Sequence, residues 1–248
     1  MTGGFTRALK LTPQFAMLLL RDRQIVFWNF GFFLLLLVLF LGILSGGEAA
    51  VRVALTAAII PIGVMANALF SVGVGLSGAR DRGVFRHYAL TPVPQSVVVL
   101  ASVTARALIV LAAAAIEVVV ANVLFGVGWP GGVAAWLSTL ALGTAAFCAI
   151  GFAIAAFAPA PHLANAAVDL VLLPMMALSG MSLPVAMMPS EWASIHWVLP
   201  AATMVDGLTA TLVQGAGFMN LLPRLAYLGL WTGAAAALGA YGWSRRDP

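Results

Sequence analysis

Three charged residues lie inside long apolar runs of this chain: Arg106, Glu117 and Asp169. An ionised side chain in an apolar interior needs an opposite charge, a hydrogen-bonding partner or a wet cavity, so each is a candidate for pairing, proton transfer or ligand binding. Arg106 and Glu117 are eleven residues apart, which on a helix is about 20° of rotation and roughly 16 Å of rise. The two side chains are therefore too far apart along the helix to form a direct ion pair. We expect Arg106 to pair with Asp169, which lies toward the same side of the membrane; a role facing a substrate is the alternative.

The histidine, cysteine and serine residues of the sequence form no recognisable catalytic or metal-binding site. His162 and His196 are far apart and beside no carboxylate cluster, so no metal site is predicted. The single cysteine, Cys148, lies in an apolar run and indicates neither a disulfide framework nor a thiolate metal site. Ser179 and Gly180 lack the preceding glycine expected of an intramembrane serine protease. The sequence also contains no Gly-x4-Gly-Lys-Ser/Thr loop, so this chain cannot hydrolyse ATP by that route.

The longest strongly polar interruption of the chain is residues 80–95. It reads Arg-Asp-Arg-Gly-Val-Phe-Arg-His-Tyr-Ala-Leu-Thr-Pro-Val-Pro-Gln. Proline removes a backbone donor and restricts the residue before it, so a short helix should end near Thr91 and a new segment begin after Pro92. We interpret the stretch as a charged helix between two membrane spans and a handle for a partner; a solvated loop that only sets topology is the alternative. The candidate contact residues are Arg80, Asp81, Arg82, Gly83, Val84, Phe85, Arg86, His87, Tyr88, Thr91 and Pro92.

The composition identifies the chain as an integral membrane protein. Hydrophobic residues make up 62% and charged residues only 8%, whereas an ordinary soluble domain is about 25% charged. The formal net charge is +4, but the charges gather at the ends of apolar runs, where they set topology and meet anionic lipid. We therefore predict membrane lipid, and not nucleic acid, as a partner.

Six apolar runs are long enough to span a bilayer, at about 20 residues each. We predict one all-α transmembrane domain over residues 1–248 with six transmembrane helices. No small-residue cleavage site follows the first run, so we expect that span to be retained. The predicted spans are residues 25–44, 53–79, 97–125, 133–158, 163–183 and 221–243.

Residues 1–24 are too polar to span but amphipathic enough to lie in the membrane interface. Arg7 and Lys10 alternate there with apolar side chains such as Leu9 and Met17. We predict an interfacial helix along the membrane surface. A frayed basic tail is the alternative, because Pro13 interrupts the pattern.

Residues 184–200 are too broken by proline to span and too apolar to be a free loop. We predict an external re-entrant helical hairpin, with its two tryptophans at the interface and its glutamate and histidine facing water. Residues 201–220 should continue this margin. The residues singled out are Gly180, Pro184, Pro189, Glu191, Trp192, His196, Trp197 and Pro200.

Lysine and arginine are distributed very unequally between the two sides of this topology. One side holds only Arg52 and Arg224, and Arg106 lies within a span. The positive-inside rule puts the richer side in the cytoplasm, so both termini and residues 80–95 should be cytoplasmic and residues 184–200 external. The richer side holds Arg7, Lys10, Arg21, Arg23, Arg80, Arg82, Arg86, Arg245 and Arg246.

Two motifs together resemble one family. Residues 80–94 resemble the coupling-helix segment of ABC-2-type ABC transporter permeases, in which a charged, glycine-containing turn precedes Thr-Pro; the acidic residue, often first there, is here Asp81. Residues 178–200 look like the family's Gly-x-x-x-Pro, Met-Pro and Leu-Pro signature, and Asp206-Gly-Leu follows. The resemblance covers nearly the whole chain.

This resemblance implies a permease subunit of an exporter in the plasma membrane. It implies a second permease half, identical or different, and two separate ABC ATP-binding subunits that hold ATP and Mg and grip the coupling helix. It further implies no cofactor in this chain and a dimer seam at the first and fifth spans, so Gly229 and Gly233 should serve packing within the subunit.

The leading hypothesis is therefore an ATP-driven exporter of amphipathic drugs, antibiotics or lipid-like compounds. The alternative is an ion- or proton-coupled secondary transporter with Glu117 and Asp169 as relays. A membrane-embedded enzyme is a third reading, for which the residues offer no adequate constellation.

Overall fold

Every regular element in the described part of the chain is a helix. The computed structural model describes residues 2–89, 93–128, 132–180, 195–196 and 198–245. A chain surrounded by hydrocarbon must satisfy its backbone groups internally, and helices do so within each segment. The predicted all-α class is confirmed.

Six helices within the described ranges are long and apolar enough to cross a membrane, as predicted. The first span consists of α2 (Arg23–Val26), η1 (Phe27–Phe32) and α3 (Phe33–Ile43). The second consists of α4 (Ala49–Ala68), η2 (Leu69–Val74) and α5 (Gly75–Asp81). The third to sixth are α7 (Gln95–Phe125), α8 (Val133–Phe157), α9 (Pro161–Leu178) and α12 (Phe218–Ser244). Both η1 and η2 are π-helical turns, which are rare and frequently mark functional sites.

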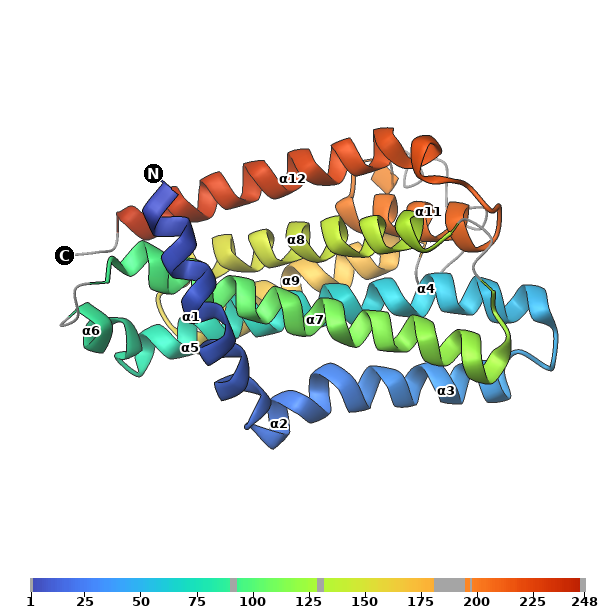
Figure 1. Ribbon diagram of the computed structural model, residues 1–248, viewed down its shortest axis with the longest axis horizontal. Coiled ribbons are helices and arrows are strands. Elements are labelled where there is room, and N and C mark those ends of the chain that lie inside the picture. Colours follow the sequence, from blue (N-terminus) through green and yellow to red (C-terminus); the bar gives the residue numbers. More distant parts are fainter. Residues whose placement is uncertain (1, 90–92, 129–131, 181–194, 197, 246–248) are drawn as a thin grey trace.

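The N-terminal helix α1 (Thr2–Leu20) runs obliquely across α7, whereas the six long helices follow the long axis of the molecule (Figure 1). Ala8, Thr12 and Leu19 are buried, while Met17 and Leu18 are exposed. The helix is therefore amphipathic, as predicted, and it contacts α7 through its buried face. Pro13 lies within it without ending it.

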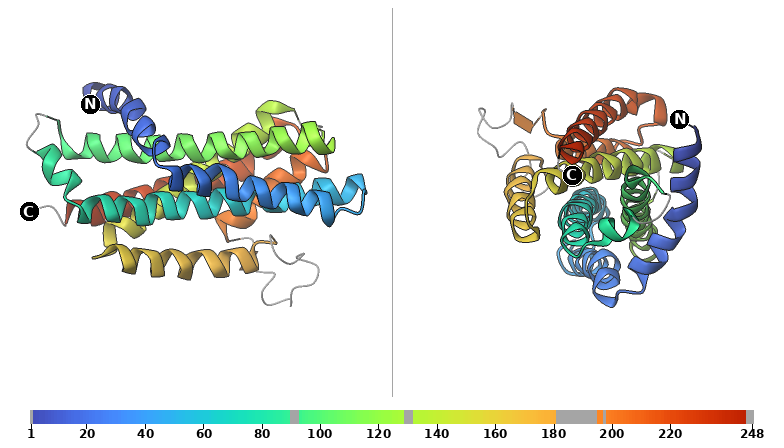
Figure 2. Two further views of the ribbon diagram at one scale, coloured as in Figure 1. Left: turned by 90° about the horizontal axis from the view of Figure 1, so that it is seen from below. Right: turned by 90° about the vertical axis from the view of Figure 1, so that its left-hand side faces the viewer.

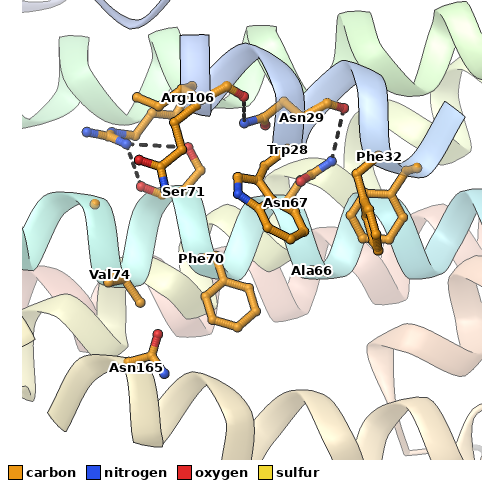
Figure 3. Close-up of a pocket in the computed structure, with 14 residues that line it drawn as sticks. Trp28, Asn29, Phe32, Ala66, Asn67, Phe70, Ser71, Val74, Arg106 and Asn165 are labelled. Carbon is orange, nitrogen blue, oxygen red and sulfur yellow. Dashed lines mark hydrogen bonds between the residues drawn. The ribbon is translucent and has the colours of Figure 1, made fainter. Parts of the chain in front are cut away.

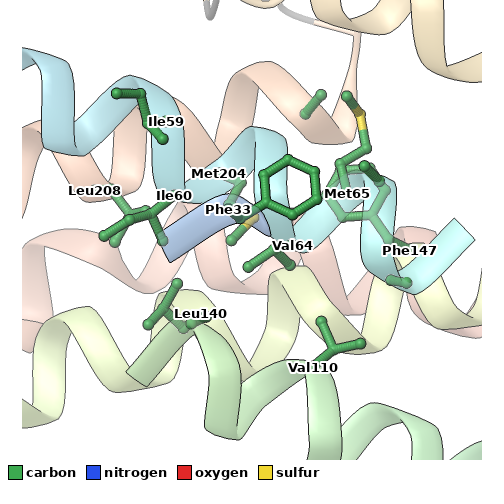
Figure 4. Close-up of a cluster of buried hydrophobic side chains, with 14 of the residues drawn as sticks. Phe33, Ile59, Ile60, Val64, Met65, Val110, Leu140, Phe147, Met204 and Leu208 are labelled. Atoms are coloured by element: carbon green, nitrogen blue, oxygen red, sulfur yellow. The ribbon is translucent and has the colours of Figure 1, made fainter. Parts of the chain in front are cut away.

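The bundle is centred on α8, which packs against α12, η2, α11, α4 and α7 (Figure 2). Its small residues permit the close approaches. A Cβ on Gly151 would lie 3.1 Å from the amide nitrogen of Gly73, and one on Gly143 would lie 2.5 Å from Sδ of Met204. Figure 4 shows the resulting core, in which Met204 and Phe147 are fully buried among residues of α4 and α7.

Residues 200–212 do not continue an external margin, contrary to the sequence-based expectation. They form α11 (Pro200–Leu212), which is inserted into the core. Met204 and Leu208 are fully buried, and Gly207 lies so close to α8 that an added Cβ would be 2.8 Å from Cγ2 of Thr139. Small and apolar side chains on one face let this short helix enter the bundle despite Asp206.

The predicted packing role of Gly229 and Gly233 is wrong. A Cβ added to either would meet nothing within 4 Å, so both lie on an open face of α12. The close contact with α8 is made about two to four turns later. A Cβ on Gly239 would lie 2.5 Å from Cδ1 of Phe152, and Gly242 similarly adjoins Phe157.

The loops and short helices that connect the spans lie at the two opposite ends of the bundle. The start of α1, the end of α12 and helix α6 (Val84–Ala89) lie at one end, and the α3–α4 and α11–α12 connections lie at the other (Figure 1). The elements predicted to share one side of the membrane therefore lie at the same end of the molecule.

Candidate functional site

The segment after the second span forms a short helix that is fixed on one side and charged on the other. Gly83, with φ of 74°, allows the sharp turn that separates α5 from α6. Phe85 is only 4% exposed and packs edge to face on Trp243 of α12, with 5.3 Å between ring centres. Arg86 and His87 are exposed on the opposite side. Asp81 and Arg82 are also exposed, Val84 and Tyr88 are half-buried, and Thr91 and Pro92 lie outside the described residues.

The described contacts of Arg80 are with two other helices of the same chain. Its Nη1 donates a hydrogen bond to the carbonyl of Ala155 at 3.0 Å, and Nη2 donates to the carbonyl of Ala158. These carbonyls belong to the last turn of α8 and the residue after it, where the helix leaves acceptors without internal donors. The guanidinium also lies over the ring of Trp243. Arg80 thus joins the beginning of the charged segment to the ends of α8 and α12.

At the opposite end, His196 is 2% exposed, so the expectation that it faces water is wrong. Its Nδ1 lies 3.3 Å from the carbonyl of Leu178, the last residue of α9, and its Nε2 lies 3.2 Å from Oδ2 of Asp206 on α11. Both ring nitrogens therefore have polar partners, one on each of two helices, which explains how the ring can be buried. Gly180, with φ of 80°, follows the end of α9, and Pro200 begins α11. Of the remaining hairpin residues, Pro184, Pro189, Glu191, Trp192 and Trp197 lie outside the described part of the chain.

The predicted ion pair between Arg106 and Asp169 is absent. Arg106, 7% exposed, donates from Nη1 to the carbonyl of Ser71 at 2.6 Å, with the Ser71 hydroxyl 3.4 Å away. Asp169 instead accepts a hydrogen bond from Nδ2 of Asn165 at 3.1 Å. The guanidinium reaches Ser71 because Gly75 has no side chain, and a Cβ there would collide with Nη1.

Glu117 is separate from these groups. It is 2% exposed, and its Oε2 has no hydrogen-bonding partner among the described residues. Its neighbours on the buried face of α7 include Ala113, Ala114 and Ala121. An unpartnered carboxyl in such surroundings is costly when ionised. The geometry provides no link between Glu117 and Asp169.

A cavity lies between the first, second and fifth spans, with Arg106 of α7 at its side (Figure 3). Its volume is about 620 Å³, within the range of small-molecule sites. Both π turns contribute to its wall, so these two turns lie beside the same cavity. The lining residues are Gln24, Ile25, Trp28, Asn29, Phe32, Phe33, Ala66, Asn67, Phe70, Ser71, Val74, Gly75, Arg106 and Asn165.

A strip of hydrogen bonds along this cavity connects the first π turn, η1, to the last turn of α4, just before η2 begins. Asn67 donates from Nδ2 to the backbone carbonyl of Asn29 at 3.3 Å, and Asn29 donates from its own Nδ2 to the carbonyl of Ile25 at 2.9 Å. Oδ1 of Asn29 and Nε of Arg106 are buried and have no partner among the described residues. The cavity therefore offers both an acceptor and a donor to a ligand, beside the aromatic rings of Trp28 and Phe70.

A family model described as ABC-2 type transporter matches residues 11–213, well over half of the chain. The chain belongs to the ABC-2 type transporter family. The matched range contains residues 80–95 and every lining residue of the cavity, and it ends before α12. The family and the six apolar helices together establish a multi-pass membrane protein.

Two curated relatives support this assignment. The chain is 28% identical over 162 residues to the inner membrane transport permease YhhJ of Escherichia coli (strain K12), a match that covers 65% of this chain and 43% of the relative. The protein of the same name from Shigella flexneri matches with the same values. The chain thus spans less than half the length of the curated relatives it matches.

Of the described residues that line this cavity, only Arg106 was predicted from the sequence as a candidate site residue. Asn29 and Asn67 were detectable, because each is an amide side chain inside a long apolar run. The π turns that contain Asn29 or follow Asn67 have no recognisable signal in the sequence. Residues 80–90 and the end of α12 were predicted to be on the same side of the membrane, but their contact through Phe85 and Trp243 was not foreseen.

Proposed function

We propose that this chain is the membrane subunit of an ATP-driven exporter that moves amphipathic compounds, such as drugs, antibiotics or lipid-like molecules, out of the cell. It resides in the plasma membrane with both termini in the cytoplasm, as the lysine and arginine distribution indicates. The observation that carries the proposal is the cavity within the bundle, which combines aromatic rings with a polar strip at membrane depth. Such a lining suits a ligand with one apolar and one polar part.

Separate ABC ATP-binding subunits, two per transporter, supply the energy in this proposal and hold ATP and Mg. The sequence lacks a phosphate-binding loop of the Gly-x4-Gly-Lys-Ser/Thr type. Helix α6 is suited to receive these subunits, because its apolar face is bound to α12 through Phe85 while Arg86 and His87 are exposed. A force on α6 would reach the end of α12 through Phe85, and a force on the end of α5 would reach the ends of α8 and α12 through Arg80.

A second permease half completes the transporter. The first and fifth spans, which flank the cavity, carry large exposed apolar residues: Leu35, Leu39 and Ile43 on α3, and Leu170 and Leu173 on α9. The end-on view shows α9 and the first span on either side of the second span (Figure 2). A second half packed against these two spans would close the cavity between the subunits.

Site-directed crosslinking tests the ATPase contact. Cys148 is the single cysteine and is buried, so Cys148→Ala provides the background for Arg86→Cys or His87→Cys. We expect both to crosslink to an ABC ATP-binding subunit in the isolated complex. Leu44→Cys, exposed at the opposite end, is the matched control and should not react with it. An actively transporting complex without crosslinks from residues 86 and 87 would refute the contact.

Transport in inside-out vesicles separates the proposed function from an ion-coupled carrier. We expect ATP to drive uptake of at least one of two fluorescent probes, an alkyl carboxylate or an alkylammonium, and expect an ionophore to leave the uptake intact. Uptake that the ionophore abolishes, and that proceeds with a non-hydrolysable ATP analogue, would instead establish the secondary transporter. The isolation of Glu117 from Asp169 argues against that alternative.

A further inference from the structure

We propose that the cavity between the first, second and fifth spans binds amphiphiles that carry one carboxylate or phosphate, and that Arg106 recognises this anionic head. Only the statement that such a ligand is a transported substrate rests on the proposed function. Binding itself depends on the described side chains alone.

Among the residues that the structure describes, Arg106 is the only charged one that lines the cavity. Its Nη1 is used by Ser71, which leaves the edge formed by Nε and Nη2 for a further acceptor. That Nε is buried and has no partner among the described residues. Carboxylates and phosphates accept two parallel hydrogen bonds from such an edge, and these charge-assisted bonds are stronger than neutral ones. An anionic head in the cavity would supply the missing acceptor.

Neither Asp169 nor Glu117 neutralises Arg106. Asp169 accepts a hydrogen bond from Asn165, which borders the cavity, but it forms no ion pair with Arg106 in the described structure. Glu117 is three turns further along α7, roughly 16 Å away along the axis. A cation buried without an opposite charge is expensive, so the site favours an anion over a neutral or cationic ligand.

The remaining wall fits an apolar body. Trp28, Phe32 and Phe70 lie around the cavity with the polar strip of Asn29 and Asn67 between them (Figure 3). Oδ1 of Asn29 has no partner among the described residues and could accept a hydrogen bond from a hydroxyl or amide next to the head group. The ligand class is thus an anion with an alkyl or aromatic body.

The depth of Arg106 agrees with entry from the cytoplasmic leaflet. It follows Gln95, the first residue of α7, by eleven positions, or about 16 Å of helix. Since α7 has 31 residues, it is about 46 Å long and exceeds the roughly 30 Å hydrocarbon layer. Arg106 would then lie about 8 Å below the cytoplasmic boundary of that layer, within reach of the head groups of that leaflet.

Quenching of Trp28 fluorescence by brominated amphiphiles tests the proposal on the purified chain in nanodiscs of neutral lipid. The measured signal is the difference in fluorescence quenching between wild type and the Trp28→Phe variant, which isolates the quenching of Trp28. ω-Bromohexadecanoate is compared with ω-bromohexadecyl trimethylammonium, which has the same chain and the opposite charge. A brominated phosphatidate added to the disc tests a membrane lipid as the source of the anion.

We expect either anionic probe to bind at least about tenfold more tightly than the ammonium, as one or two charge-assisted bonds would give. Arg106→Gln should remove this preference and Arg106→Lys should keep part of it. Arg52→Gln is the matched control, because Arg52 also donates to a backbone carbonyl, that of Phe125, but outside the cavity. It should retain the full preference.

Equal binding of carboxylate, phosphatidate and ammonium by wild type would overturn the inference, and this comparison needs no variant to fold. A preference unchanged in a folded Arg106→Gln protein would also overturn it. These outcomes are distinct from failure of the proposed function. Anion binding without ATP-driven uptake would support the anion site and refute the exporter. Equal ATP-driven uptake of the carboxylate and the ammonium probes would support the exporter and refute the anion site.

Discussion

The guanidinium carbon of Arg80 lies 5.5 Å from the centre of the Trp243 ring, so the beginning of the charged segment is bound to the end of the sixth span. The same side chain donates to the carbonyls of Ala155 and Ala158 at the end of α8. One residue therefore connects three elements at the end of the molecule where we propose that the ATPase binds.

Replacing Arg80 with alanine should lower the free energy of unfolding by about 1–3 kcal/mol, because hydrogen bonds from a charged donor and a cation–π contact are lost together. Arg80→Lys should recover only part of this, since an ammonium cannot reproduce the fork to two carbonyls. Detergent-induced unfolding in mixed micelles measures the change. Arg86→Ala, exposed on α6, is the control and should remain within about 0.5 kcal/mol of wild type. An equal loss in both variants would contradict the anchoring role.

Phe85 and Trp243 should be energetically coupled. Phe85→Ala removes a nearly buried ring and should cost about 3–5 kcal/mol. A double-mutant cycle with Trp243→Ala should give a coupling energy of about 0.5–1.5 kcal/mol for the edge-to-face contact. If the two losses were additive, α6 would not be held by α12. We further expect the coupled pair to be needed for ATP-driven transport.

Glycines on the two faces of α12 should respond in opposite ways to alanine. Gly239→Ala forces a Cβ to 2.5 Å from Phe152 and should destabilise the bundle by about 1–3 kcal/mol. Gly233→Ala introduces a methyl group into open space and should be neutral or slightly stabilising. Thermal unfolding of the two purified variants provides the comparison. Similar destabilisation of both would show that the open face is covered in the assembled protein.

The His196–Asp206 contact should stabilise the link between α9 and α11. His196→Ala leaves the Leu178 carbonyl and the Asp206 carboxylate without the ring, and should cost about 1–3 kcal/mol. The double-mutant cycle with Asp206→Ala should show coupling of about 0.5–3 kcal/mol. His162→Ala, on an exposed residue of α9, is the control and should have little effect. A coupling energy of zero would show that the His196–Asp206 contact does not stabilise the fold.

Glu117→Gln should leave ATP-driven transport unchanged. Glutamine keeps the shape of the side chain but cannot ionise, so the variant removes any proton relay while preserving packing. Initial rates of probe uptake in vesicles are the measurement. A rate reduced by about tenfold or more, in a variant that folds and assembles normally, would revive the ion-coupled alternative.

Composition and periodicity alone determined the class of this protein and much of its topology. The length needed to cross a bilayer is a local property of one segment, so six apolar runs predicted six helices. The excess of lysine and arginine likewise predicted that α6, the start of α1 and the end of α12 share one end. The family resemblance rested on short motifs, and such motifs can be read from the order of residues in the sequence without knowledge of the fold.

Tertiary structure alone decided which side chains meet. Arg106 lies with Ser71 rather than with Asp169, His196 is buried against Asp206, and Gly239, not Gly233, contacts α8. Each contact depends on the rotation of one helix relative to another, and rotation is set by the combined packing of residues far apart in the chain. The cavity depends in addition on two π turns, which shift the side chains of the first and second spans out of the regular helical order that sequence periodicity assumes.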